Sequence, residues 1–333
     1  MMRYRVYVTR SIPQPGLDLL RRECGLVDVR SSKDIPTQKE LIEGVEGKHA
    51  LLCLLTDPVG SEVIAAGRDL RIIANYAVGY DNIDVAAATR KGIMVTNTPG
   101  VLTDTTADFA FALMMATARR VAEADRYVRA AKWKVPWGLM MMVGQDVWGK
   151  TLGIIGLGRI GSAMAQRARG MNMRMIYYDI YRNEQAEKEL GVKFVDLETL
   201  LKESDFVSVH VPLLPETRHL INERTLKLMK RTACLVNTSR GEVVDEKALY
   251  KALTEGWIWG AGLDVWEKEP TDQDNPLLKL DNVTVAPHIA SASIATRTKM
   301  AVMAAENMVA IQEGKVPPNL VNKEVLGVRP PAK

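Results

Sequence analysis

Apolar and polar positions follow two alternating patterns through the first hundred residues. Short apolar runs, typical of buried strands, occupy residues 3–9, 50–55, 71–78 and 93–97. Amphipathic patterns typical of helices lie between them, at residues 16–24, 37–45, 60–70 and 84–92. Strands that alternate with helices indicate βαβ units and a parallel sheet.

The middle of the chain departs from this alternation. Residues 103–128 predict one long helix, which Thr103 or Asp104 could cap. Its first half is apolar on nearly every face, so we expect it to be buried. Residues 132–149 follow no regular pattern and carry three of the 6 tryptophans. We expect this segment to be a loop that covers a site or meets a partner.

From residue 151 the alternation of strands and helices restarts, which predicts a second parallel sheet. A final helix is expected at about residues 291–313, before Gly314. The predicted strands are residues 152–156, 174–179, 206–211, 233–237, 260–265 and 283–287.

The first strand of this second half leads into a glycine motif, Gly156-x-Gly158-x-x-Gly161, and a helical pattern follows it. The next strand ends in Asp179, 18 residues after the last glycine. This context is typical of a dinucleotide-binding site, in which the pyrophosphate meets the helix N-terminus. A tight strand-to-helix turn without a ligand is the alternative interpretation.

Asp179 predicts which dinucleotide binds. Its carboxylate can accept hydrogen bonds from the ribose hydroxyls of the adenosine, whereas a 2′-phosphate would place negative charge against it. We therefore expect NAD, with NADH preferred over NADPH. Arg182, three residues further on, could offset part of that repulsion.

Composition and charge indicate which partners and which cellular location to expect. The net charge of +4 is small and the basic residues are scattered, so we expect no nucleic-acid or membrane partner. The 3 cysteines form no CxxC pair, and we interpret them as free thiols, buried in the case of Cys53 and Cys234. No apolar run is long enough for a membrane span, and residues 1–10 lack a signal-peptide core. These features favour a cytoplasmic protein.

Three later strand ends carry candidate chemistry: Arg240, the glutamates Glu267 and Glu269, and His288. Arg240 can grip a carboxylate with its planar fork, or it can pair with an acidic neighbour at the surface. Taken alone, either glutamate is typical of a surface carboxylate and His288 of a structural histidine. No further ligands accompany His288, so we expect no metal site.

The order of these motifs resembles the D-isomer-specific 2-hydroxyacid dehydrogenase family, and within it the glyoxylate/hydroxypyruvate reductases. The resemblance covers nearly the whole chain. It rests on residues 75–84 (NYAVGYDNID), 97–113 (NTPGVLTDTTADFAFAL), 153–161 (GIIGLGRIG), 237–245 (NTSRGEVVD), 262–270 (GLDVWEKEP) and 286–293 (APHIASAS).

The resemblance implies a role for each candidate. Arg240 would bind the substrate carboxylate and polarise the carbonyl, and His288 would be the general acid/base. Glu269, rather than Glu267, would orient His288, since a neighbouring carboxylate favours the imidazolium form. The backbone of Val78 and Gly79 would also take the substrate carboxylate.

The same resemblance implies the cofactor contacts, with Asp264 and the 237–240 backbone beside the nicotinamide. The implied cofactor-binding residues are Thr106, Gly156, Leu157, Gly158, Arg159, Ile160, Gly161, Asp179, Ile180, Tyr181, Val211, Pro212, Thr217, Thr238, Ser239, Arg240, Asp264, His288 and Ala290.

The fold class implied is α/β, with two Rossmann/flavodoxin-like doubly wound parallel-sheet domains and the cofactor domain inserted into the substrate domain. Residues 1–99 and 290–333 would form the substrate-binding domain, and residues 100–289 the NAD-binding domain. A homodimer would form through residues 103–149. The chain departs from the family pattern at Met140–Met142, where the reductases often place an aromatic residue.

Our prediction is therefore the NADH-dependent reduction of a small 2-oxo acid, glyoxylate or hydroxypyruvate first, to the D-2-hydroxy acid. D-3-phosphoglycerate dehydrogenase is the nearest enzymatic alternative. Phosphite dehydrogenases carry a lysine where this chain has Val78, and formate dehydrogenases carry a glutamine where it has Glu269. Both differences argue against these two activities. A corepressor-like NAD-sensing binding protein is the alternative from another class.

Overall fold

The computed structural model describes residues 3–330, and the chain divides into two compact units. One unit comprises the described parts of Met1–Leu102 and Ala292–Lys333, and the other comprises Thr103–Ser291. The second unit is thus inserted into the sequence of the first. Each unit contains its own sheet and its own hydrophobic core.

The sheet of the first unit has five parallel strands in the order β2-β1-β3-β4-β5. The four strands expected here are confirmed, and one strand was missed. That strand, β2, lies at the sheet edge and is only half buried, so its sequence LVDV lacks a continuous apolar run. The strands are β1 (Arg5–Val8), β2 (Leu26–Val29), β3 (Ala50–Leu54), β4 (Ile72–Tyr76) and β5 (Met94–Thr96).

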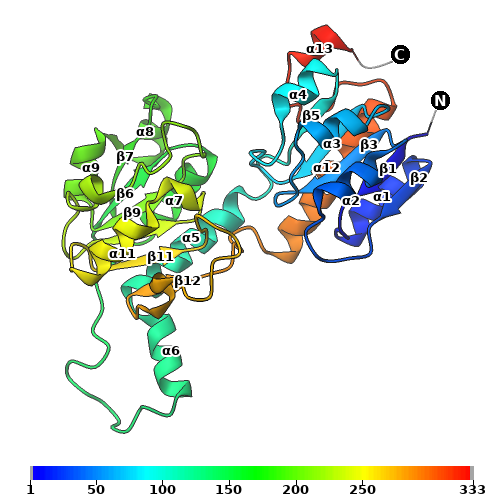
Figure 1. The fold of residues 1–333 in the computed structure, drawn as a ribbon. Coiled ribbons are helices and arrows are strands. Elements are labelled where there is room, and N and C mark those ends of the chain that lie inside the picture. The colour runs from blue at the N-terminus through cyan, green and yellow to red at the C-terminus, as the bar shows by residue number, and fades with distance from the viewer. Residues whose placement is uncertain (1–2, 331–333) are drawn as a thin grey trace. The chain divides into compact units, whose positions relative to one another are not determined.

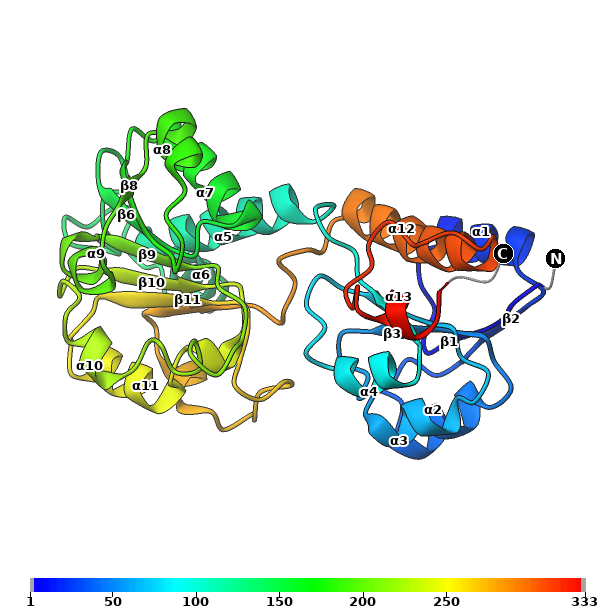
Figure 2. The ribbon, with the colours of Figure 1, turned by 90° about the horizontal axis from the view of Figure 1, so that it is seen from above.

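Helices cover both faces of this sheet (Figure 2), with α1 and α12 on one face and α2, α3 and α4 on the other. Gly16 lets α1 approach α12 closely, because a Cβ atom there would lie 2.7 Å from the Ala301 carbonyl oxygen. The helices are α1 (Gln14–Glu23), α2 (Gln38–Val45), α3 (Ser61–Ala66), α4 (Val85–Arg90), α12 (Ile294–Gln312) and α13 (Val325–Val328).

The sheet of the second unit has seven parallel strands in the order β12-β11-β10-β9-β6-β7-β8. All six expected strands are confirmed, and β8 was missed because it is only 2 residues long. Chain order reverses between β6 and β9, where ligands bind in open α/β sheets. The strands are β6 (Thr151–Ile155), β7 (Arg174–Tyr178), β8 (Lys193–Phe194), β9 (Phe206–Val209), β10 (Cys234–Asn237), β11 (Gly260–Leu263) and β12 (Val283–Val285).

Figure 2 shows α5 and α7 on one face of this sheet and α9, α10 and α11 on the other. The predicted α/β class with two parallel sheets is therefore confirmed. The helices are α5 (Thr103–Ala118), α6 (Val121–Arg129), α7 (Arg159–Arg169), α8 (Glu184–Leu190), α9 (Leu197–Glu203), α10 (Glu223–Leu226) and α11 (Glu246–Thr254), with short 3₁₀ turns η1 (Gly241–Val243) and η2 (Pro276–Lys279).

The prediction of a single helix over residues 103–128 is wrong, because the helix is interrupted between α5 and α6. Arg120 adopts a left-handed conformation with φ 55°, and the Ala118 carbonyl accepts the Gln145 amide at 2.8 Å. Thr103 is already the first residue of α5, so neither Thr103 nor Asp104 precedes the helix as a cap. The first half of α5 is buried through Thr106, Ala107 and Ala110, whereas Asp104 and Asp108 are exposed, so the expected burial holds for one side of the helix. The irregular segment after α6 is confirmed.

Two further expectations concern buried and membrane-spanning segments. Cys24, Cys53 and Cys234 are all buried and free, as expected of Cys53 and Cys234. Within the described part of the chain, no helix combines the length and apolar character that crossing a bilayer requires.

Candidate active site

The glycine motif forms the turn between β6 and α7 as its spacing predicts. Gly156 has φ 92°, and a Cβ atom there would lie 2.9 Å from Val211. A Cβ atom at Gly161 would lie 2.1 Å from the Gly156 carbonyl oxygen, so this glycine permits the close packing of helix on strand. Gly158 is different, because a Cβ atom there would meet no atom within 4 Å. Its missing side chain therefore leaves open space rather than relieving a contact inside the protein.

Two observations fit a dinucleotide at this turn. Gly158 precedes α7, and no described side chain caps the first turn of that helix, which carries Arg159 and Ile160. Exposed helix N-termini bind phosphate through their backbone N–H groups. The hydroxyl of Thr238, at the end of β10, is buried without a hydrogen-bond partner among the described residues. Buried hydroxyls are normally satisfied, so Thr238 is a candidate contact for a bound cofactor.

Asp179 ends up beside the glycine turn. Its two carboxylate oxygens accept the Leu157 amide at 2.8 Å and the Ile180 amide at 2.7 Å. Each oxygen retains a lone pair that could accept a ribose hydroxyl. Ile180 and Tyr181, the next two residues, are strongly exposed. The acidic residue at the end of β7 is therefore fixed by the glycine turn itself.

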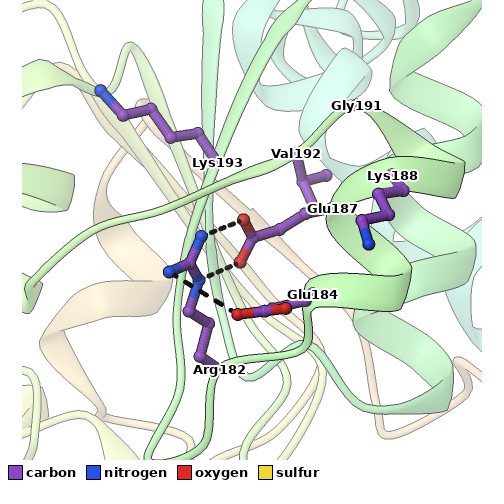
Figure 3. A pocket seen from close by; sticks show the side chains of 7 residues that line it. All are labelled: Arg182, Glu184, Glu187, Lys188, Gly191, Val192 and Lys193. Atoms are coloured by element: carbon purple, nitrogen blue, oxygen red, sulfur yellow. Dashed lines mark hydrogen bonds and ion pairs between the residues drawn. The ribbon is translucent and has the colours of Figure 1, made fainter.

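Arg182, near the end of the same strand, is already paired with an acidic side chain. Its guanidinium contacts Glu187 of α8 through two hydrogen bonds of 2.9 Å, drawn as dashed lines in Figure 3. Glu187 also accepts the Tyr177 hydroxyl at 2.9 Å, and the Arg182 hydrogen bonds lower the pKa of Glu187 to about 2. The surrounding hollow of about 480 Å³ is lined by Arg182, Glu184, Glu187, Lys188, Gly191, Val192 and Lys193.

The expected contact between His288 and Glu269 is formed. His288 Nδ1 lies 2.7 Å from a carboxylate oxygen of Glu269, and the other oxygen of Glu269 accepts the Trp266 amide at 3.1 Å. The two side chains are 27% and 28% exposed, so the pair can still be reached from solvent. Burial raises the pKa of Glu269, but the hydrogen bond and charge of His288, the Trp266 amide and the charge of Arg240 outweigh it. The carboxylate therefore stays ionised beside the imidazole.

Asp264 holds the backbone of the histidine segment. Its carboxylate is fully buried and accepts the amides of Ile289 and Ala290, each at 2.8 Å. Its carbonyl accepts the His288 amide at 2.7 Å, and His288 adopts φ 55°. A left-handed histidine is uncommon and persists where surrounding contacts impose it. The observed contacts of Asp264 thus position His288.

Arg240 follows β10 in a loop that Asn237 organises. The buried Asn237 side chain accepts the amide and hydroxyl of Ser239, at 3.0 and 2.9 Å, and donates to the Arg240 carbonyl at 2.8 Å. The Arg240 guanidinium donates to the Ser239 carbonyl at 2.8 Å. Because β10 and β11 are neighbouring parallel strands, the Arg240 loop and the segment that carries Glu269 leave the same edge of the sheet.

The remaining cofactor candidates of this unit lie at the carboxyl ends of its strands or nearby. Val211 and Pro212 follow β9, and the Thr217 hydroxyl bridges their loop by donating to the Pro212 carbonyl at 2.6 Å and accepting the Leu214 amide at 2.8 Å. Thr106 is buried in the first turn of α5, a helix that packs on α7. Because the sheet is entirely parallel, the strand ends share one edge.

Val78 and Gly79 belong to the other unit, directly after β4. The Asn97 side chain donates to the Val78 carbonyl and the Asn75 side chain to the Gly79 carbonyl, both at 2.8 Å. Neither amide of this pair makes a hydrogen bond with another described residue. The two N–H groups are therefore suited to bind an anionic ligand atom.

The sequence interpretation missed a second histidine–glutamate pair. His219 Nε2 lies 2.9 Å from Glu267, so the two glutamates of the segment after β11 each hold a different histidine. It also missed Asn237, for which a polar residue at a strand end was the available signal. No local signal pointed to His219, because 48 residues separate it from Glu267.

Together, these contacts provide an anion-binding turn, a cationic arginine and a histidine that can exchange a proton through Nε2. Among residues 3–330, no group of three or more histidine, cysteine or acidic side chains is arranged to hold a metal ion. The arrangement can reduce a carbonyl beside a carboxylate if a dinucleotide supplies the hydride.

Comparison with known proteins shows which family this chain belongs to. The model of the family described as "D-isomer specific 2-hydroxyacid dehydrogenase, NAD binding domain" matches residues 111–290. The curated glyoxylate reductase of Korarchaeum cryptofilum is 63% identical over 330 residues, which cover 99% of each chain. That of Thermofilum pendens is 52% identical over 332 residues, covering 99% of this chain and 98% of the relative.

A solved structure extends the agreement to the fold. The crystal structure of a protein from Thermus thermophilus has a TM-score of 0.90 and 45% sequence identity. The match covers 95% of this chain and 99% of that protein. The fold of this chain is therefore similar to that of a protein of known structure.

Proposed function

Because the chain belongs to the D-isomer-specific 2-hydroxyacid dehydrogenase family, we propose that it reduces small 2-oxo acids with NADH, glyoxylate and hydroxypyruvate first. The product is the D-2-hydroxy acid where a stereocentre forms. The names of the curated relatives support glyoxylate as a substrate. The observation that carries the proposal is the contact between Glu269 and His288, with the charge of Arg240 acting on the same carboxylate.

In this proposal, a bound NADH would supply the hydride that reduces the carbonyl carbon of the substrate. His288 donates a proton from Nε2 to the carbonyl oxygen as negative charge develops there, so the 2-oxo acid becomes a 2-hydroxy acid. Glu269 orients the ring through Nδ1 and stabilises its protonated form. Arg240 binds the substrate carboxylate and polarises the carbonyl, acting where charge develops.

The residues that would hold the cofactor follow from the glycine turn. The pyrophosphate would lie over Gly158 at the start of α7, and the Thr238 hydroxyl would gain a partner. Asp179 would accept the ribose hydroxyls. The carboxylate of Asp179 and the capture of Arg182 by Glu187 both support NADH over NADPH, because the arginine at this strand end is already neutralised and attracts a 2′-phosphate less.

The substrate carboxylate would also meet the backbone N–H groups of Val78 and Gly79. This assignment rests on the family resemblance and on the two amides, neither of which donates a hydrogen bond to another described residue. It makes the first unit the substrate-binding domain and the second unit the NAD-binding domain.

We further propose a homodimer formed through residues 103–149. Helix α6 projects from the second unit and an irregular segment follows it (Figure 1). Large apolar side chains of this segment are strongly exposed, including Trp137 at 74%, Leu139 at 76% and Met140 at 75%. Exposed apolar groups gathered in one segment are typical of an interface.

One kinetic comparison tests the proposal. NADH and NADPH oxidation is followed in parallel with glyoxylate, hydroxypyruvate, pyruvate and phosphohydroxypyruvate. We expect the highest kcat/KM with glyoxylate or hydroxypyruvate and NADH. A preference for phosphohydroxypyruvate would instead assign the chain to phosphoglycerate oxidation, and no turnover of any of the four acids would contradict an enzymatic role.

A further inference from the structure

We infer that His219, Glu246 and Glu267 are positioning residues that hold the glutamate of the acid/base pair in place. The inference rests on the proposed function, since it gives these three side chains a task in the same reaction. The hydrogen bonds of these three side chains are made with residues other than Glu269 and His288. They act through the backbone of the segment that follows β11.

The main contact among these side chains is reciprocal and joins the start of α11 to the segment after β11. The Glu246 carboxylate accepts the Glu267 amide at 2.7 Å, and the Glu267 carboxylate accepts the Glu246 amide at 3.1 Å. Glu246 is the first residue of α11, so its amide has no partner within the helix. The pair therefore ties the start of α11, which follows the Arg240 loop, to the segment that carries Glu269.

Two side chains complete this contact. His219 Nε2 lies 2.9 Å from the Glu267 oxygen that accepts the Glu246 amide, and Asn275 donates to the other oxygen of Glu246 at 2.9 Å. His219 lies directly after the loop that includes Pro212 and Thr217. The histidine thereby adds a third segment of the predicted cofactor site to the same contact.

A glycine brings the loops this close. A Cβ atom at Gly241 would lie 1.8 Å from the Trp266 carbonyl carbon and 2.4 Å from the Glu267 nitrogen. No side chain fits between these backbones. The residue after Arg240 therefore packs directly on the backbone that the reciprocal contact holds.

Only two hydrogen bonds separate the backbone of this segment from His288. The Trp266 amide donates to one oxygen of Glu269, whose other oxygen contacts His288. Fixing the backbone of residues 266 and 267 thus fixes the direction of the Glu269 carboxylate, and the carboxylate fixes the imidazole. Small displacements matter, since a misplacement of about 1 Å can reduce a rate on the order of 10²-fold.

The test compares Glu267→Ala with Glu267→Gln and with a matched control, Glu242→Gln. Glutamine keeps an oxygen that can accept the same hydrogen bonds, whereas alanine removes it. The control breaks the ion pair of Glu242 with Arg218, at 2.8 Å, which joins the same loops without contacting the segment after β11.

For Glu267→Ala we expect kcat with glyoxylate and NADH to fall about tenfold or more, within the range for misplaced catalytic groups. The KM values for glyoxylate and NADH should change far less. Hydrogen exchange, read by mass spectrometry, should become faster in peptides covering residues 264–270. Glu267→Gln should restore most of kcat and of the exchange protection, and Glu242→Gln should match the wild type in both.

The outcomes separate this inference from the proposed function. If the wild type is active and Glu267→Ala matches the Glu242→Gln control in kcat, the inference is overturned. If the wild type reduces none of the acids, the proposed function fails, while hydrogen exchange still tests the positioning. Should Glu267→Ala fail to fold, His219→Asn replaces it, because asparagine tolerates the φ of 50° at this position. Unchanged exchange at residues 264–270 in that variant would also overturn the inference.

Discussion

The Nδ1 atom of His288 lies 2.7 Å from Glu269, and this contact determines which ring nitrogen can serve the reaction. An ionised carboxylate only accepts hydrogen bonds, so Nδ1 carries the proton of that contact and Nε2 is the ring nitrogen left for the proposed proton transfer. The left-handed backbone of His288, held by Asp264, gives the ring its direction. Sequence neighbours contribute little here, because 19 residues separate the two partners.

Replacing Glu269 by glutamine should lower kcat on the order of 10²-fold, since the amide no longer stabilises the protonated ring. NADH binding, measured by fluorescence titration, should persist. His288→Asn should reduce turnover further with the same retention of NADH. Loss of NADH binding in folded variants would contradict the assigned roles.

The lowered pKa of Glu269 also predicts how this contact depends on pH. A carboxylate with a lowered folded-state pKa stabilises the fold fully above its ordinary pKa, and this stabilisation is lost as pH falls through the lowered value. Urea unfolding of wild type and Glu269→Gln should therefore differ most above about pH 4.5, the ordinary value of a glutamate. The difference should shrink in more acidic buffer; a constant difference would contradict the ion-pair interpretation.

Two glycines of the turn after β6, Gly158 and Gly161, should respond differently to alanine. Gly158→Ala adds a methyl group to open space, so we expect a change in thermal stability no larger than about 1 kcal/mol but weaker NADH binding by at least about tenfold. Gly161→Ala forces a methyl group against the Gly156 carbonyl and should destabilise the fold by roughly 1–3 kcal/mol. Calorimetry and NADH titration of both variants provide the measurement. Equal NADH affinity in Gly158→Ala and wild type would argue against a pyrophosphate there.

Asp179 and Glu187 should together determine cofactor choice. Asp179→Asn removes the charge that repels a 2′-phosphate, worth about 1 kcal/mol at 4 Å in water, and should raise the NADPH/NADH ratio of kcat/KM at least about fivefold. Adding Glu187→Gln releases Arg182 while keeping an acceptor for the Tyr177 hydroxyl, so the ratio should rise again. A ratio unchanged in the double variant would refute both assignments.

The exposed apolar segment after α6 should determine the oligomeric state. Leu139→Asp places a charge where the proposed interface buries an apolar side chain, and we expect the dimer to dissociate. Light scattering coupled to size exclusion gives the mass of each species. Ile294→Asp, at an exposed position outside residues 103–149, is the control and should leave the mass unchanged. A wild-type chain that is monomeric at micromolar concentration would refute the dimer.

Much of the architecture could be read from local patterns. Buried parallel strands form continuous apolar runs, so all strands except the exposed edge strand β2 and the very short β8 were predicted. The steric demand at Gly161 is also local, because it arises from Gly156 and Ile154 of the same motif and strand, whereas that at Gly156 arises from His210 and Val211 after β9. The break at Arg120 was not predictable in this way, since it depends on a hydrogen bond from Gln145.

The sequence by itself determined the order of the strands along the chain and, through its motifs, which strand ends carry polar chemistry. The family resemblance also predicted that Glu269 would partner His288, and the structure contains that contact. Only the tertiary structure decided two further partners, Glu267 with His219 and Arg182 with Glu187. The physical reason is that sequence patterning reports which residues are buried, whereas hydrogen bonds between loops depend on positions that the parallel sheet brings to one edge. Two glutamates of one short segment thus took different histidines.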